Sequence, residues 1–208
     1  MPYLYSPADV AALMAQARRI PTPFRAATFE TLIGLLAVTG MRVGETIHLL
    51  RRDLDWDAAI LLIRAAKFNK SRAVPLQAST LEALAAYART RDRLGPRRQA
   101  PTFFVSTVGS PLVYRNVAVT FRDLVTRAGL AGDPPSCRPR IHDLRHSFAV
   151  TTVLEWYRAG ADVGARLPWL STYLGHRDPR STYWYLHAAP ELLALAAHRL
   201  EATLGDIR

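Results

Sequence analysis

The stretch "HDLRHSFA", His142 to Ala149, decides how this 208-residue chain is interpreted. His142 and Arg145 lie three residues apart, so on a helix they project from one face. Leu144 and Phe148 flank them as apolar residues that anchor the helix to a core. A histidine and an arginine held together on a partly buried helix are costly unless they bind an anion. The stretch therefore predicts a helix that carries an anion-binding site.

A second arginine stands in "TGMRVGE", Thr39 to Glu45. Arg42 follows the helix-breaking Gly40, where its side chain and nearby free backbone donors can face the same anion. The guanidinium group is a rigid two-pronged donor that suits phosphate oxygens. Each of these residues alone would also suit a structural role. Together they indicate a clamp for phosphate.

The charge of the chain points to the same class of partner. Its formal net charge is +10 and its pI is near 10.4, which favours an anionic partner, nucleic acid first. No apolar run reaches the roughly 18 residues of a membrane span, so no membrane partner is expected. The single cysteine, Cys137, excludes an internal disulfide and a multi-cysteine zinc site. These features favour a reduced, cytoplasmic and nucleoid-associated protein.

The two lysines of the chain, Lys67 and Lys70, lie in one four-residue window, whereas every other basic side chain except histidine is arginine. Guanidinium does not titrate in proteins, whereas an ammonium group can release its proton. A lysine that arginine has not replaced therefore indicates proton transfer. Both lysines fit this role from the residues alone.

The apolar periodicity predicts a mainly α fold with a small antiparallel β-sheet, an α+β class. Ser6 and Pro7 are typical of a helix start, and Ser79 with Glu82 form a second capping box. Residues 54–59 read as a turn, and residues 59–77 read as a strand, a tight turn around residues 68–70 and a second strand that ends at Pro75. The helices are expected over these ranges: 6–19, 26–40, 44–54, 79–94, 114–130, 142–160, 167–176 and, from Pro190, 190–205.

Two tyrosines follow in "GHRDPRSTYWYLH", Gly175 to His187. Tyr183 or Tyr185 could be placed against the phosphate as a nucleophile, and both could instead be packing side chains. The residue types alone do not choose between them.

These four stretches, "TGMRVGE", "KFNKSRAVPL", "HDLRHSFA" and "LGHRDPRSTYWYLH", resemble in order and spacing the catalytic domain of tyrosine recombinases, the phage-integrase family. The resemblance runs from about Leu4 to Leu204. It implies the tyrosine recombinase catalytic-domain fold, which is related to type IB topoisomerases. Because the pattern starts within the first few residues, we expect residues 1–208 to form a single catalytic domain, with the N-terminal core-binding domain of the family absent.

The resemblance also implies a role for each matching residue. Glu45 would support the first catalytic arginine, and the nucleophile position falls on Tyr185, which leaves Tyr183 as a packing residue. Lys67 is favoured over Lys70 as the catalytic lysine, so Lys70 and Arg72 become expected DNA contacts. The implied catalytic residues are Arg42, Lys67, His142, Arg145, His176 and Tyr185.

The implied activity is breakage and rejoining of DNA strands through a 3′-phosphotyrosyl intermediate, as in site-specific recombination, integration and transposition. The expected partner is double-stranded DNA, on which the family allows a homotetramer, and neither a metal, a cofactor nor ATP is expected. The main alternative is a truncated, DNA-binding-only remnant or regulator derived from an integrase. DNA relaxation of the type IB topoisomerase kind shares the chemistry. A generic basic nucleic-acid binder explains the charge but not four ordered motifs.

Overall fold

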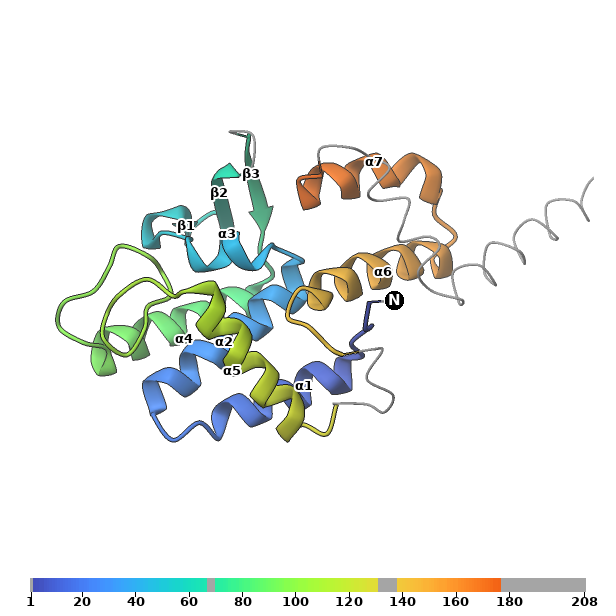
Figure 1. The fold of residues 1–208 in the computed structure, drawn as a ribbon. Helices are drawn as coiled ribbons and strands as arrows, with labels where there is room; N and C mark the ends of the chain where they lie inside the picture. The colour runs from blue at the N-terminus through green and yellow to red at the C-terminus, as the bar shows by residue number, and fades with distance from the viewer. Residues whose placement is uncertain (1, 67–69, 131–137, 177–208) are drawn as a thin grey trace, which may run out of the picture.

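The computed structural model describes residues 2–66, 70–130 and 138–176 (Figure 1). Its helices are α1 (Pro7–Arg18), α2 (Pro23–Thr39), α3 (Val43–Ile47), α4 (Ala78–Leu94), α5 (Tyr114–Arg127), α6 (Asp143–Arg158), α7 (Val163–Leu174) and the 3₁₀ helix η1 (Arg51–Asp53). Its strands are β1 (Leu54–Asp55), β2 (Ile60–Ala66) and β3 (Lys70–Pro75), paired antiparallel in the order β1-β2-β3. The predicted fold class is therefore confirmed. The helix expected from Pro190 lies outside the described residues.

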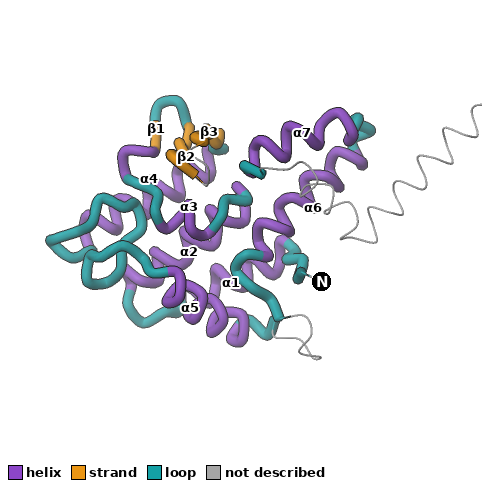
Figure 2. The backbone as a smooth tube through the Cα atoms, turned by 45° about the horizontal axis from the view of Figure 1, so that its top comes forward, coloured by secondary structure: helices purple, strands orange, loops and turns teal. Residues whose placement is uncertain are grey.

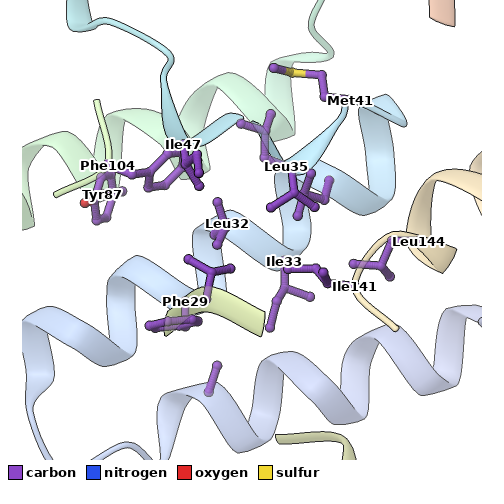
Figure 3. Packing of buried hydrophobic residues seen from close by; sticks show 14 of the residues in the cluster. Phe29, Leu32, Ile33, Leu35, Met41, Ile47, Tyr87, Phe104, Ile141 and Leu144 are labelled. Carbon is purple, nitrogen blue, oxygen red and sulfur yellow. The ribbon is translucent and has the colours of Figure 1, made fainter. Parts of the chain in front are cut away.

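Helix α2 forms the centre of the fold because its sequence is apolar on nearly every side. It packs against α1, α4 and α6 (Figures 1 and 2). Phe29, Leu32 and Ile33 of α2 lie in the buried cluster that Figure 3 shows, together with Tyr87 of α4 and Leu144 of α6. This packing fixes the C-terminal end of α2, from which Arg42 follows, relative to the start of α6.

Helix starts follow local chemistry, with one prediction wrong. The Asp9 backbone N–H donates to Ser6 Oγ over 3.1 Å and the Ser6 N–H donates to the Asp9 carboxylate over 2.9 Å, so the expected cap of α1 is confirmed. Helix α4 instead begins at Ala78 with Gln77 as an N-cap that makes no side-chain bond. Ser79 lies inside the first turn, so it cannot cap the helix as predicted.

Further ranges differ from the sequence prediction. Helix α2 already begins at Pro23, and the helix expected over residues 44–54 is divided into α3, which ends at Ile47, and the 3₁₀ helix η1. Residues 54–59 contain the short strand β1 before their turn, because the buried Leu54 pairs with Leu61 of β2. Helix α7 begins at Val163 rather than at residue 167, since the Asp162 carboxylate accepts from the Ala165 N–H over 3.0 Å. Among the described helices, none is long and apolar enough to cross a membrane.

Gly40 ends α2 in the left-handed region, with φ of 60°. A Cβ built there would overlap the ring of Phe148, which stacks on Tyr173. We expect Gly40→Ala to lower the free energy of unfolding by ~2–4 kcal/mol, from the left-handed backbone cost and from overpacking. Urea unfolding of this variant measures the loss.

Gly44→Ala is the matched control, because a Cβ at Gly44, inside α3, meets nothing within 4 Å. It should leave stability unchanged or raise it by up to ~1 kcal/mol through better helix propensity. Equal unfolding midpoints for the two variants would contradict the described close contact between Gly40 and Phe148.

Candidate active site

Four segments that are far apart in the sequence meet at one place. They are the start of α3, strand β3, the first turn of α6 and the residues that follow α7. Figures 1 and 2 show the β-hairpin and α7 on the same side of the helical body, with the C-terminal end of α7 directed toward the hairpin. Hydrogen bonds across these segments bring Arg42, Arg72 and Arg145 close to Gly175 and its neighbour His176.

Arg42 is the N-cap of α3 and is held on two sides. Its Nη1 donates to Glu45 Oε1 over 2.9 Å, and its Nη2 donates to the Gly175 carbonyl over 2.7 Å. Its backbone N–H donates to the other Glu45 oxygen over 3.0 Å, so Glu45 holds both the side chain and the backbone of Arg42. The side chain remains 31% exposed. The guanidinium is therefore fixed in direction while one side stays accessible to an anion.

Arg145 is more deeply placed, with 3% of its surface exposed. Its Nη1 donates to the Gly40 carbonyl and its Nη2 to the Leu174 carbonyl, each over 2.7 Å. Gly40 is the C-cap of α2, and Leu174 is the last residue of α7. Because helix C-termini carry unsatisfied carbonyls and partial negative charge, one buried cation satisfies two helix ends at once.

Glu45 lies between two arginines. Its carboxylate accepts from Arg42 as described and from Arg72, whose Nη1 and Nη2 donate to Oε1 and Oε2 over 3.0 and 2.8 Å. Burial alone would raise the pKa of Glu45, but the hydrogen bonds from Arg72 and Arg42 outweigh it and hold this pKa below its usual range. The carboxylate is therefore ionised and fully engaged at neutral pH.

Three histidines lie around the arginines. The His142 and His146 rings meet edge to face with centroids 5.0 Å apart. Burial, followed by the charge of Arg145, lowers the pKa of His142 and brings the pKa of His176 to about 4. Burial also lowers the pKa of His146 to about 4, with His142 as the next contributor. These imidazoles are therefore neutral at pH 7, which leaves each able to accept a proton or a hydrogen bond.

The histidine pKa values predict a stability that falls in mild acid. In the unfolded chain these imidazoles take up protons near pH 6.5, whereas His146 and His176 in the folded chain do so only near 4. The unfolded state thus binds more protons below about pH 6.5, so stability is lost as the pH falls from there. Thermal melts between about pH 7.5 and pH 5 measure this loss.

His146→Gln should show a shallower decline than the wild type over that range, because one of the buried imidazoles is gone. His48→Gln is the control, since His48 is exposed at the end of α3, and it should follow the wild-type curve. A wild-type melting temperature that does not change with pH would contradict the burial of these groups.

Several predicted site residues cannot be placed. Lys67 and both candidate nucleophiles, Tyr183 and Tyr185, lie outside the described residues. Lys70 opens strand β3, and of it only the backbone is described. The six other predicted residues are brought together by the fold: Arg42, Glu45, Arg72, His142, Arg145 and His176.

The side chain of Arg72 lies on the inward face of the hairpin, which the sequence analysis did not predict. In the hairpin, Arg72 pairs with Ile63 and Val74 pairs with Leu61, so these four side chains share one face of the sheet. The three apolar members are buried, which places Arg72 on the inward face. The sequence carries a signal of this position. Arg72 stands two residues before the apolar Val74, and residues two apart in a strand point to the same face.

The arrangement can bind one tetrahedral anion, because its positive charges and hydrogen-bond donors are already in place. Arg42 presents an accessible guanidinium, Arg145 supplies a buried positive charge, and His142 and His176 stay neutral beside them. Such fixed donors stabilise charge that develops on a phosphoryl group. Across the described ranges, no three His, Cys, Asp or Glu side chains are grouped as metal ligands.

Comparison with known proteins agrees with this site. The model of the phage integrase family matches residues 5–191. An integrase/recombinase of Sinorhizobium fredii, y4rB, is 43% identical over 99% of this chain and 67% of its own length. The tyrosine recombinase XerC of Anoxybacillus flavithermus is 32% identical over 79% of this chain and 51% of its own length.

A solved structure shares the fold. The XerH site-specific recombinase, bound to its palindromic difH substrate in a post-cleavage complex, superposes with a TM-score of 0.72 at 25% identity, over 96% of this chain and 54% of that chain. The chain thus spans between half and two thirds of the length of these relatives. By family model, sequence identity and fold, this chain belongs to the phage integrase family, the family of tyrosine recombinases.

Proposed function

We propose that this chain cleaves and rejoins DNA strands by transesterification at a phosphodiester, as a site-specific recombinase or integrase. One observation carries the proposal: residues from three separate sequence motifs, Arg42, Arg145 and His176, meet in one positively charged site. A phosphodiester repels an incoming oxygen because it is negatively charged. Arg42 and Arg145 would neutralise its non-bridging oxygens, and His176 would add a hydrogen bond.

Tyr185 is the proposed nucleophile. A phenol with a pKa near 10 needs help to lose its proton, and His142, neutral at pH 7, is the proposed acceptor. The phenolate oxygen forms a bond to phosphorus while the bond from phosphorus to the 5′ oxygen breaks. Lys67 would give that oxygen its proton, leaving a 5′ hydroxyl and a 3′-phosphotyrosyl ester. Because one ester replaces another, the reverse step rejoins a strand without ATP.

Double-stranded DNA is the proposed partner. The net charge of +10 favours a polyanion, and the related XerH site-specific recombinase is bound to its palindromic difH substrate in a post-cleavage complex. Assembly of several copies on DNA, up to a tetramer, belongs to this proposal as well. A DNA-binding remnant without chemistry is the competing function, and the retained set of Arg42, His142, Arg145, His176 and Tyr185 argues against it.

Covalent capture tests the proposed chemistry. The protein is incubated with nicked duplexes that tile the DNA flanking its gene, in buffer with EDTA, and then run on a denaturing gel. The nick lets the cut fragment diffuse away, so a cleaved strand stays attached to the protein. We expect a labelled species that migrates with the protein and disappears after protease. Retarded DNA on a native gel with no covalent species would favour the remnant.

A further inference from the structure

Arg72 makes contacts in the site but has no role in the reaction proposed above. Its side chain is 12% exposed and donates hydrogen bonds to both oxygens of Glu45, over 3.0 and 2.8 Å. Bidentate pairing of this kind fixes direction as well as distance. Glu45, itself 9% exposed, in turn holds Arg42 by its side chain and its backbone N–H. A continuous chain of bonds therefore runs from the hairpin to Arg42.

Gly175 lies where this chain of bonds ends. Its carbonyl accepts from Arg42 Nη2, and a Cβ built on it would lie 2.8 Å from Arg72 Nη1. A Cβ there would press on the Arg72 guanidinium, which Glu45 holds in place, and φ of 69° itself favours glycine. Strand β3, helix α3 and the end of α7 are thus joined around one carboxylate.

The charges of the cluster explain why two arginines share one carboxylate. A lone Arg42–Glu45 pair would be neutral, and its guanidinium would attract a phosphate weakly. With Arg72 added, two guanidinium groups face one carboxylate, so the cluster keeps a net positive charge. Arg42 is the more exposed of the two, with 31% of its side chain exposed against 12% for Arg72, so Arg42 is where that charge meets an incoming anion.

This geometry disfavours a direct phosphate contact by Arg72, the role expected from the sequence. One hydrogen on each terminal nitrogen is committed to Glu45, and the remaining Nε is buried with no hydrogen-bond partner among the residues that the structure describes. Each terminal nitrogen keeps a second hydrogen, but the side chain is only 12% exposed, and a phosphate drawn onto Arg72 would compete with Glu45 for the guanidinium.

We infer that Arg72 is a positioning residue, which acts through Glu45 to hold Arg42 and to leave positive charge on it for the scissile phosphate. The inference rests on the proposed function, because it assigns Arg72 a part in the same reaction. A loss of Arg72 would therefore slow the cleavage step and leave the affinity for DNA almost unchanged.

The test compares Arg72→Met with the wild type by two separate readouts. Single-turnover cleavage at saturating nicked duplex reports the chemical step, and we expect a ~10²-fold slower rate, the scale of a misplaced catalytic group. The dissociation constant on an intact duplex, measured over a range of salt, reports phosphate contacts. Its dependence on salt should keep the wild-type slope, whereas a lost contact would reduce the slope by about 0.9.

Two further variants sharpen the test. Arg72→Lys keeps the charge but not the two-pronged grip, so its cleavage rate should fall between those of the wild type and Arg72→Met. Arg64→Met is the matched control: Arg64 lies on the same hairpin, but its Nε donates to the buried Asp53 over 2.6 Å, whereas Arg72 donates to Glu45. It should cleave at the wild-type rate, which controls for one lost charge on the hairpin.

The outcomes separate cleanly. A wild-type cleavage rate for Arg72→Met, or a reduced salt slope, would overturn the positioning role. If the wild-type chain does not cleave any of the duplexes, the proposed function fails. The salt dependence of DNA binding by Arg72→Met then decides alone. A slope reduced by the value of about one phosphate contact would make Arg72 a DNA contact and overturn the inference. An unchanged slope would keep Arg72 as a partner of Glu45 and not of DNA.

Discussion

Tyr185→Phe is expected to abolish the covalent protein–DNA species, with a loss of at least ~10⁴-fold in the rate of its formation. The substitution removes the only oxygen of the side chain that would attack phosphorus, and loss of a nucleophile is among the largest effects that a single change can have on catalysis. DNA affinity should stay close to that of the wild type, because the ring and its neighbours remain. Quantitative gels of the trapped species measure the rate.

Tyr183→Phe is the matched control, since it makes the same change two residues earlier. It should form the covalent species within a few-fold of the wild-type rate. Loss of the species in Tyr183→Phe but not in Tyr185→Phe would exchange the two assignments. Retention of the species in both variants would place the nucleophile outside this stretch.

Arg145→Ala is expected to have the second largest effect, on folding and chemistry together. It leaves the Gly40 and Leu174 carbonyls without their charged donor and opens a cavity between α2, α6 and α7. Hydrogen bonds to charged groups contribute about 1.5–3 kcal/mol each, so we expect the free energy of unfolding to fall by ~3–5 kcal/mol. The loss of one positive charge beside the phosphate should slow cleavage by a further ~10²–10³-fold.

Urea unfolding and single-turnover cleavage separate these two effects. Arg145→Lys keeps a positive charge but replaces the planar fork, so it should recover part of the stability and little of the rate. Arg122→Ala is the control, because Arg122 is exposed on α5 and should change stability by less than ~0.5 kcal/mol. A fully stable Arg145→Ala would contradict the double capping of the helix ends.

The sequence was sufficient for the class of fold and for six residues that the fold brings together. The apolar periodicity of residues 26–40 predicted the central helix, because a buried helix needs apolar residues on every side. The spacing of His142 and Arg145 predicted that the two lie together, and the charge of Arg145 acts on both His142 and His176. These features could be predicted because they depend on residue type and local spacing.

Other features depend on contacts that no local pattern records. Backbone carbonyls such as those of Gly40 and Gly175 carry no mark in the sequence, yet they hold Arg145 and Arg42. The pairing of Arg72 with Glu45 spans 27 residues and needs the hairpin register. Helix α4 shows that a local pattern can also mislead, since Ser79 and Glu82 have the residue types of a capping box but the helix begins at Ala78.

The identity of the residue joined to DNA tests the central claim most directly. The trapped species would be digested with trypsin and nuclease, and the peptide that retains a nucleotide would be sequenced by mass spectrometry. We predict the peptide that follows Arg180, with the nucleotide attached through its 3′ phosphate to Tyr185. Attachment to any other residue, or through a 5′ phosphate, would contradict the account.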